Sequence, residues 1–151
     1  MKNPLIRDYF SKSDKEKIVK AIQEAELNTS GEIRVYFENS TKKMDTLDRA
    51  YQAFKKLEMD QTDLQNGVLI YIAFKDHKCA IIGDAGIHKK VGDAFWKEEL
   101  EIMRSHFRNG KYTEGLTKVI KLAGERLSEY FPYQRDDKNE LSDDIYFDEE
   151  N

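Results

Sequence analysis

Residues 67–86 read GVLIYIAFKDHKCAIIGDAG, and this stretch decides the fold. Val68–Phe74 is an unbroken apolar run, the pattern typical of a strand that is buried on both faces. The polar turn Lys75–His77 joins it to a second short strand, Lys78–Ile82, which ends abruptly at Gly83–Gly86. The stretch therefore predicts a buried β-hairpin that leads into a glycine-rich loop carrying one aspartate.

A further strand is predicted before the hairpin, at Glu32–Phe37, where apolar and polar residues alternate. Side chains of a strand point to opposite faces of the sheet in turn. We therefore expect two sets of residues, with Ile33, Val35 and Phe37 on one face and Glu32, Arg34 and Tyr36 on the other.

Helical spacing marks four more segments. The first begins at a capping box, Ser13 to Glu16, and ends near Asn28. The second is capped by Asp45, the third runs from about Lys90 to His106, and the last begins near Thr113. We expect the first helix to bury Ile18, Ala21, Ile22 and Ala25, and the second to bury Leu47, Ala50, Tyr51, Phe54 and Leu57. We expect the third to bury Phe95, Leu100 (or Trp96), Met103 and Phe107, and the last to bury Leu116, Val119, Ile120, Ala123 and Leu127.

The order of these elements predicts the fold class. Parallel strands that are joined through a helix form right-handed units. Glu32–Phe37 and Val68–Phe74 should therefore run parallel, while Lys78–Ile82 runs in the opposite direction. We expect an α/β fold, a three-layer α/β/α sandwich with helices on both faces of a small mixed sheet. Residues 1–135 form one such domain.

Charge is distributed unevenly along the chain. The net charge is −4, but residues 136–151 alone carry −7, which leaves +3 for the rest. So acidic a segment predicts a disordered tail. Ile145, Tyr146 and Phe147 interrupt it, and two interpretations stay open. In the first, they form a docking peptide. In the second, they are incidental apolar residues of a solvated tail, and the composition favours this second interpretation.

Composition excludes several classes of function. No block of Lys and Arg interleaved with aromatics is present, so we do not expect nucleic-acid binding. The sequence has no apolar run long enough for a membrane span and no signal peptide. We therefore expect a cytoplasmic protein without stable membrane insertion. The single Cys79 rules out an internal disulfide and a cysteine zinc site, and the polar tail favours a monomer.

Three segments should meet at one end of the predicted sheet: residues 30–32, 63–67 and 83–86. The start of the following helix lies above them. The acidic residues that become neighbours are Glu32, Asp63, Asp84 and Asp93. Clustered carboxylates repel one another unless a cation intervenes, and hard oxygen ligands suit Ca²⁺ or Mg²⁺. The topology therefore predicts a divalent-cation site at this end.

Other interpretations of these residues stay open. Asp84 and Asp93 can simply cap a turn and a helix start, and Glu32 can be a surface residue of its strand. The Gly83–Gly86 loop can hold an anion on its backbone amides, although it lacks the Lys-Ser/Thr pair of a nucleotide-binding P-loop. Cys79 and the three histidines have no catalytic context in the sequence.

Four motifs, in their order and spacing, resemble the TPM domain family. This family is named for a thylakoid lumen phosphatase, a photosystem II repair protein and a nicotinic-receptor modulator. The motifs are SGEIRV at 30–35, NGVLIY at 66–71, IIGDAGI at 81–87 and FRNGKYTEGL at 107–116. The resemblance covers roughly Ile18–Tyr130, and the chain looks like a short, stand-alone bacterial member.

The resemblance implies an α/β/α sandwich, divalent-metal binding at a carboxylate cluster and, for plant members, acid phosphatase activity. The matching positions are Glu32, Asp63, Asp84 and Asp93. Many members carry a signal peptide and a membrane anchor, and we expect neither in this chain. The chain also departs from the family in having Gly-Asp-Ala-Gly at 83–86, where members often have Gly-Tyr-Gly. We rank a metal-binding module that engages a protein partner first, a metal-dependent phosphatase of phosphate monoesters second, and a purely structural domain third.

Overall fold

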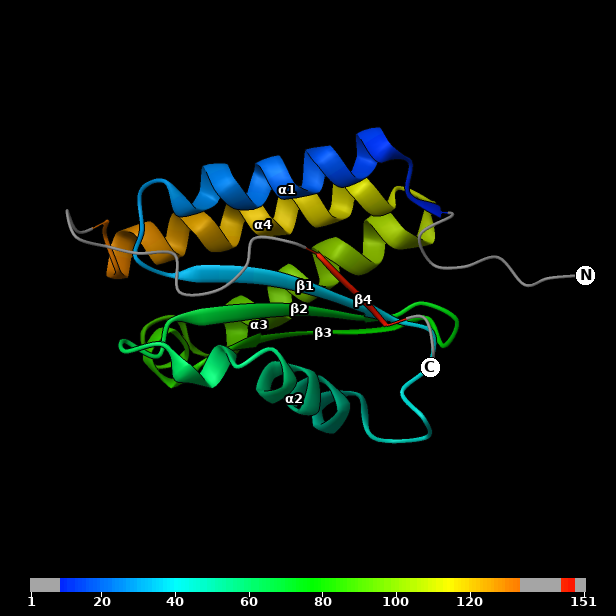
Figure 1. Ribbon diagram of the computed structural model, residues 1–151, viewed down its shortest axis with the longest axis horizontal. Coiled ribbons are helices and arrows are strands. Elements are labelled where there is room, and N and C mark those ends of the chain that lie inside the picture. Colours follow the sequence, from blue (N-terminus) through cyan, green and yellow to red (C-terminus); the bar gives the residue numbers. More distant parts are fainter. Residues whose placement is uncertain (1–8, 134–144, 149–151) are drawn as a thin grey trace, which may run out of the picture.

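The computed structural model describes residues 9–133 and 145–148. These residues form four α-helices, one short 3-10 helix and four strands (Figure 1). None of the described helices is both long enough and apolar enough to cross a membrane. In chain order the elements are α1 (Lys12–Glu26), β1 (Glu32–Glu38), α2 (Thr46–Lys56), η2 (Met59–Gln61), β2 (Gly67–Ala73), β3 (Lys78–Gly83), α3 (Ala85–Arg108), α4 (Tyr112–Tyr130) and β4 (Tyr146–Asp148).

The strands form one mixed sheet in the order β3-β2-β1-β4. β1 and β2 are parallel, with Glu32 opposite Gly67. β2 and β3 are antiparallel, with Val68 opposite Gly83. The predicted directions of these three strands are confirmed. As a result, the starts of β1 and β2 and the end of β3 lie at the same end of the sheet.

Helices cover both faces of the sheet, with α1, α3 and α4 on one face and α2 on the other (Figure 1). The alternation predicted for β1 is confirmed. Ile33, Val35 and Phe37 pack into the core beneath α1, α3 and α4, whereas Tyr36 packs into the core beneath α2. The α/β/α sandwich is therefore confirmed. All five apolar positions predicted for α4 are buried, namely Leu116, Val119, Ile120, Ala123 and Leu127.

The cap of α1 is Ser11, so the predicted capping box at Ser13 is wrong. The Ser11 hydroxyl accepts a hydrogen bond from the Asp14 backbone N–H at 3.0 Å, and the Asp14 carboxylate accepts one from the Ser11 N–H at 2.9 Å. The physical reason lies just upstream. Phe10 is buried in the core, so the chain enters the helix directly after it.

Asp45 caps α2 as predicted, by accepting from the backbone N–H groups of Leu47 and Asp48. The predicted buried stripe is only partly correct, since Leu47 and Tyr51 are more than half exposed. The face that packs on the sheet is instead Ala50, Ala53 and Phe54, with Leu57 partly buried beside it. Two alanines on the contact face let the helix lie close to the sheet, which leaves the flanking large residues outside.

α3 begins at Ala85 rather than near Lys90. Asp84 is its cap, so residues 83–86, which were predicted to be a loop, end one strand and start this helix. Gly92 interrupts α3 with φ +77°, a conformation that glycine adopts easily. α3 is therefore two helical segments joined at a kink, and the predicted helix matches the second. Trp96 and Met103 are buried there, while Phe95, Leu100 and Phe107 are partly buried.

Part of the predicted disordered tail belongs to the sheet. Tyr146–Asp148 forms β4, which pairs in parallel with Tyr36–Glu38 of β1. The Phe147 ring stacks on the Phe37 ring with 5.0 Å between centroids. For these residues the structure shows an ordered edge strand instead of a solvated tail. The rest of the tail, residues 136–144 and 149–151, lies outside the described residues.

Candidate metal site at the loop end of the sheet

The loop before β2 and the start of α3 meet at the end of the sheet where β1 and β2 begin. A Cβ atom on Gly86 would lie 2.3 Å from the carbonyl oxygen of Leu64 and 2.7 Å from that of Gln65. The Ile87 backbone N–H also donates to the Gln65 carbonyl oxygen at 3.3 Å. Only a glycine permits so close an approach of two backbones. Gly86 therefore allows the start of α3 to lie directly against residues 64 and 65.

We call residues 62–66 and 83–86 the loop cluster. Within it, one carboxylate oxygen of Asp84, Oδ1, accepts a hydrogen bond from the Ala85 N–H at 2.8 Å. The other oxygen, Oδ2, is buried and has no hydrogen-bond partner among the described residues, and the same is true of the Thr62 hydroxyl. Buried oxygen atoms without a donor are costly. The loop cluster therefore contains two buried oxygen atoms whose hydrogen-bonding capacity the described residues leave unsatisfied.

The four predicted carboxylates are not equivalent. Asp63 lies in the loop cluster and is exposed, on the loop that faces Asp84. Glu32 is buried, and its carboxylate lies 4.0 Å from the Arg34 guanidinium. The Asp93 carboxylate lies 3.3 Å from Nε2 of His88. The structure thus has Asp63 on the loop that packs against the start of α3, where Asp84 is the cap, whereas Glu32 and Asp93 each lie beside a basic side chain.

Within residues 9–133 and 145–148, no three His, Cys, Asp or Glu side chains are grouped so that they could hold a metal ion. Calcium sites need few side chains when backbone carbonyls and waters complete about six to eight oxygen ligands. The donors that the loop cluster offers are of this kind, namely the carboxylates of Asp63 and Asp84 and the carbonyls of Leu64 and Gln65. They fit Ca²⁺ or Mg²⁺ and not a soft metal.

Trp96 connects the loop cluster to the rest of α3. Its ring covers Gly83, where an added Cβ would come within 2.3 Å of it. Its indole N–H donates to Nδ1 of His88 at 3.0 Å. Because Nδ1 accepts, the neutral imidazole carries its proton on Nε2, which faces Asp93. Trp96 is the single tryptophan of the chain, so its fluorescence reports on this region alone.

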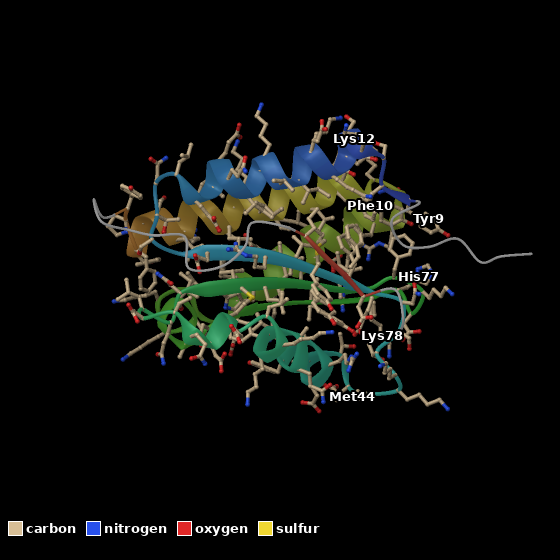
Figure 2. The ribbon with its side chains drawn as sticks, in the orientation of Figure 1. Tyr9, Phe10, Lys12, Met44, His77 and Lys78 are labelled. Atoms are coloured by element: carbon tan, nitrogen blue, oxygen red, sulfur yellow. The ribbon has the colours of Figure 1, made fainter. Side chains whose placement is uncertain are left out.

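A cavity of about 710 Å³ lies at the opposite end of the sheet, between the β2–β3 hairpin and the end of α3. Figure 2 shows His77, Lys78 and Tyr9 at this end of the molecule. Lys78, Arg104 and Cys79 are among its lining residues. Burial raises the pKa of the Cys79 thiol, although Arg104 partly opposes the shift. The thiol therefore stays protonated near neutral pH, which disfavours a nucleophilic role.

Sequence reasoning missed an ionic network at the far end of β1. Glu38 is fully buried, and both of its carboxylate oxygens accept from Arg49 at 2.7 Å. The Tyr71 hydroxyl donates to the same carboxylate. The predicted strand ended at Phe37, one residue too early. Continuing the alternation by one step would have placed Glu38 on the face that carries Tyr36.

Glu99 in α3 was also missed. It is 2% exposed, and neither of its carboxylate oxygens has a hydrogen-bond partner among the described residues. Burial raises its pKa to about 8, and the charge of Arg126 only partly opposes this. Helical spacing could have found it, because Glu99 lies three residues after Trp96 and four before Met103, on the buried stripe of α3.

Residues 7–126 match the TPM domain family, which is most of the chain. The chain belongs to the TPM domain family. The resemblance that the four sequence motifs suggested is therefore confirmed. Comparison with curated proteins gave no match.

Solved structures share the fold of this TPM domain. The NMR structure of the BA42 protein from the psychrophilic bacterium Bizionia argentinensis is 42% identical, with a TM-score of 0.86 over 95% of this chain and 98% of that one. The N-terminal domain of the cg2496 protein from Corynebacterium glutamicum is 16% identical, with a TM-score of 0.64 over 81% and 76%. The N-terminal domain of a protein from P. gingivalis is also 16% identical, with a TM-score of 0.68 over 86% and 85%. At 16% identity these two similarities concern the fold alone.

Proposed function

We propose that this TPM domain binds a divalent cation, Ca²⁺ or Mg²⁺, in the loop cluster. The observation that supports this most directly is the buried Asp84 Oδ2, which no donor among the described residues reaches. A nearby cation stabilises an ionised carboxylate in such a position. The carbonyl oxygens of Leu64 and Gln65, on the facing loop close to Gly86, add the hard donors that these ions prefer.

Asp84 and Asp63 would hold the ion directly. Asp63 is exposed, so its side chain can turn toward Asp84 at little cost. Glu32 and Asp93 would coordinate only by leaving Arg34 and His88, their neighbours in the structure. We therefore assign them the role of setting the charge around the ion.

Bound metal would supply positive charge that joins residues 62–66 to the start of α3. At a concentration about 100 times Kd, such binding adds about 2.7 kcal/mol to the free energy of unfolding. Mg²⁺ demands nearly octahedral geometry, whereas Ca²⁺ accepts irregular sets of carbonyl and carboxylate oxygens. The irregular segment of residues 62–66, which presents the Leu64 and Gln65 carbonyls, favours Ca²⁺.

The experiment is a titration of the full chain with Ca²⁺ and with Mg²⁺, followed by Trp96 fluorescence and backbone amide NMR shifts. We expect saturable changes at residues 62–66 and 83–86. Asp84→Asn should weaken affinity by roughly tenfold or more, because it removes a charged ligand. Asp60→Asn removes the same charge at an exposed position outside the loop cluster and should leave affinity unchanged. Shifts that do not saturate, or that are confined to residues 136–151, would contradict the proposal.

We further propose that the domain acts as a protein-interaction or maintenance module rather than as an enzyme. Metal-dependent hydrolysis of phosphate monoesters is the alternative, which the family resemblance implies. The loop cluster contains no lysine or arginine, so it offers no cationic side chain of its own to clamp a phosphate. An aryl phosphate assay with metal between about pH 5 and pH 8 decides the matter. Hydrolysis that is lost in Asp84→Ala would favour the phosphatase.

A further inference from the structure

Among the described residues, a three-residue strand from far along the chain covers the outer edge of β1. Tyr146–Asp148 pairs in parallel with Tyr36–Glu38. β1 and β2 are each seven residues long and buried throughout, whereas every residue of β4 is half-buried. The core is otherwise completed by the helices on both faces. β4 is thus a short cover at the edge of the sheet.

Each side chain of this cover meets a matching group. The Tyr146 ring stacks on the Tyr36 ring with 4.7 Å between centroids, and the Asp148 carboxylate accepts from the Tyr36 hydroxyl at 3.1 Å. Phe147 stacks on Phe37 on the other face. The edge of β1 therefore contacts the side chains of β4 as well as its backbone, so it can select a strand by its side chains.

Two lysines from helices on opposite faces flank the edge. Nζ of Lys56 in α2 lies 4.9 Å from the centre of the Tyr146 ring and 3.7 Å from the Asp148 carboxylate. Nζ of Lys15 in α1 lies 5.5 Å from the centre of the Phe147 ring. Cations in these positions attract aromatic faces and carboxylates. They favour an occupant that is both aromatic and acidic.

Nearer the start of β1, a side chain occupies one backbone group of the same edge. The backbone N–H of Ile33 donates to the Glu26 carboxylate at 2.8 Å, which satisfies a group that a neighbouring strand would otherwise pair. Unpaired edge strands are templates for the addition of another chain. On this side of β1, the described residues show strand pairing at Tyr36–Glu38.

We propose that the β1 edge at Tyr36–Glu38 is a strand-addition site for a partner protein segment with two adjacent aromatic residues followed by an acid. Such a segment adds in parallel, so that its backbone gives affinity while Lys56 and Lys15 give specificity. The chain's own Tyr146–Asp148 is the built-in competitor, and a partner binds when β4 leaves. This site lies at the end of β1 and does not depend on the proposed metal site at its start.

The test uses the full-length chain with the double substitution Tyr146→Ser and Phe147→Ser. This variant removes both stacked rings of the cover and keeps every group of the edge. The probe is a fluorescent synthetic peptide with the sequence of residues 141–151, followed by anisotropy. We expect saturable binding to the double variant. Binding to the wild-type chain should be about tenfold weaker or more, because its own β4 holds the site.

Two charge reversals on α2 form a matched pair in the double variant. Lys56→Glu places a negative charge beside the acidic residue of the peptide and should weaken binding by about tenfold or more. Lys55→Glu makes the same change at the exposed neighbouring position and should leave binding unchanged. A peptide of the same composition in scrambled order should not bind.

The proposal is wrong if the double variant is folded, as judged by its NMR spectrum, and does not bind the peptide. It is equally wrong if Lys56→Glu binds as well as Lys55→Glu. Should the double variant not fold, Asp148→Asn is a milder way to weaken the attachment of β4 to β1, since it removes only the charge that faces Lys56. It should bind the peptide more tightly than the wild type, and equal affinity would overturn the proposal. A wild-type dimer that is lost in Asp148→Asn would mean that copies exchange β4, which would also overturn it.

Discussion

The guanidinium of Arg49 holds the carboxylate of Glu38 through two hydrogen bonds of 2.7 Å. The Glu38 side chain has no exposed surface, and that of Arg49 is 15% exposed. The hydrogen bond to Glu38 raises the pKa of Arg49. Burial raises the pKa of Tyr71, and its hydrogen bond to the same carboxylate adds to the shift. The pair fastens α2 to the ends of β1 and β2.

Replacing Arg49 with alanine should therefore be strongly destabilising. The change leaves a buried carboxylate without its cation, which costs about 3–5 kcal/mol in proteins. Urea denaturation near neutral pH measures the loss. Arg108→Ala is the matched control, because the Arg108–Glu101 pair of 2.9 Å is exposed on both sides and should be worth less than about 1 kcal/mol. Equal losses in the two variants would contradict the prediction.

Glu99 should make the fold less stable as pH rises. Burial raises its pKa from 4.5 to about 8. Between these two values the folded chain binds a proton that the unfolded chain has released. Linkage then requires the free energy of unfolding to fall with rising pH across this window, by at most about 1.4 kcal/mol per pH unit. The contribution is favourable below the window and is lost above it.

The substitution Glu99→Gln isolates this contribution, because it removes the titrating proton and keeps the shape. The difference in unfolding free energy between Glu99→Gln and wild type should increase from about pH 5 to pH 8 in urea titrations. Glu98→Gln, at the exposed neighbouring position, should follow the wild type at every pH. Parallel curves for wild type and Glu99→Gln would refute the assignment.

The hydrogen bond between Trp96 and His88 should be measurable as a coupling. Trp96 is 8% exposed, so His88→Ala leaves a mostly buried N–H without its acceptor, at a cost of about 1–3 kcal/mol. In a Trp96→Phe background the same substitution should cost clearly less, since no N–H is left to satisfy. A double-mutant cycle in urea gives the coupling free energy. A value near zero would show that the bond does not contribute in solution.

Gly86→Ala should force the two segments of the loop cluster apart. The new methyl group would meet the Leu64 and Gln65 carbonyl oxygens at less than 3 Å, and overpacking of this kind costs about 1–3 kcal/mol. Ala85→Ser, at the exposed position before it, should have little effect. If the proposed cation site is correct, Gly86→Ala also weakens cation affinity. Lost stability with unchanged affinity would place the ion elsewhere.

The directions of β1, β2 and β3 could be predicted because their signals are local. An apolar run such as Val68–Phe74 needs burial on both faces, and the alternation in Glu32–Phe37 fixes which residues face which layer. The end of β3 and the start of α3 could not be located in this way. Asp84 is equally typical of a loop and of a helix cap. Gly92 interrupts the helical periodicity, so the first segment of α3 is too short to be recognised from its apolar spacing.

The candidate site was predictable only in part. Strand direction predicted that the segments of Asp63 and Asp84 lie at the same end of the sheet, and the structure has them there; their role as ligands stays a prediction. The alternation of β1 already places Glu32 and Arg34 on one face, so their proximity was within reach of the sequence. The contact of Asp93 with His88 spans the kink at Gly92, which a helical periodicity does not predict. Glu99 escaped because a charged residue on a helix is normally exposed.

The order of strands in the sheet also affects how the protein is made. Asp148 follows its hydrogen-bond partner Tyr36 by 112 residues. At a synthesis rate of about 5–20 residues per second, β1 therefore waits on the order of 10 s for the strand that covers it. During that interval every nascent chain carries an open sheet edge.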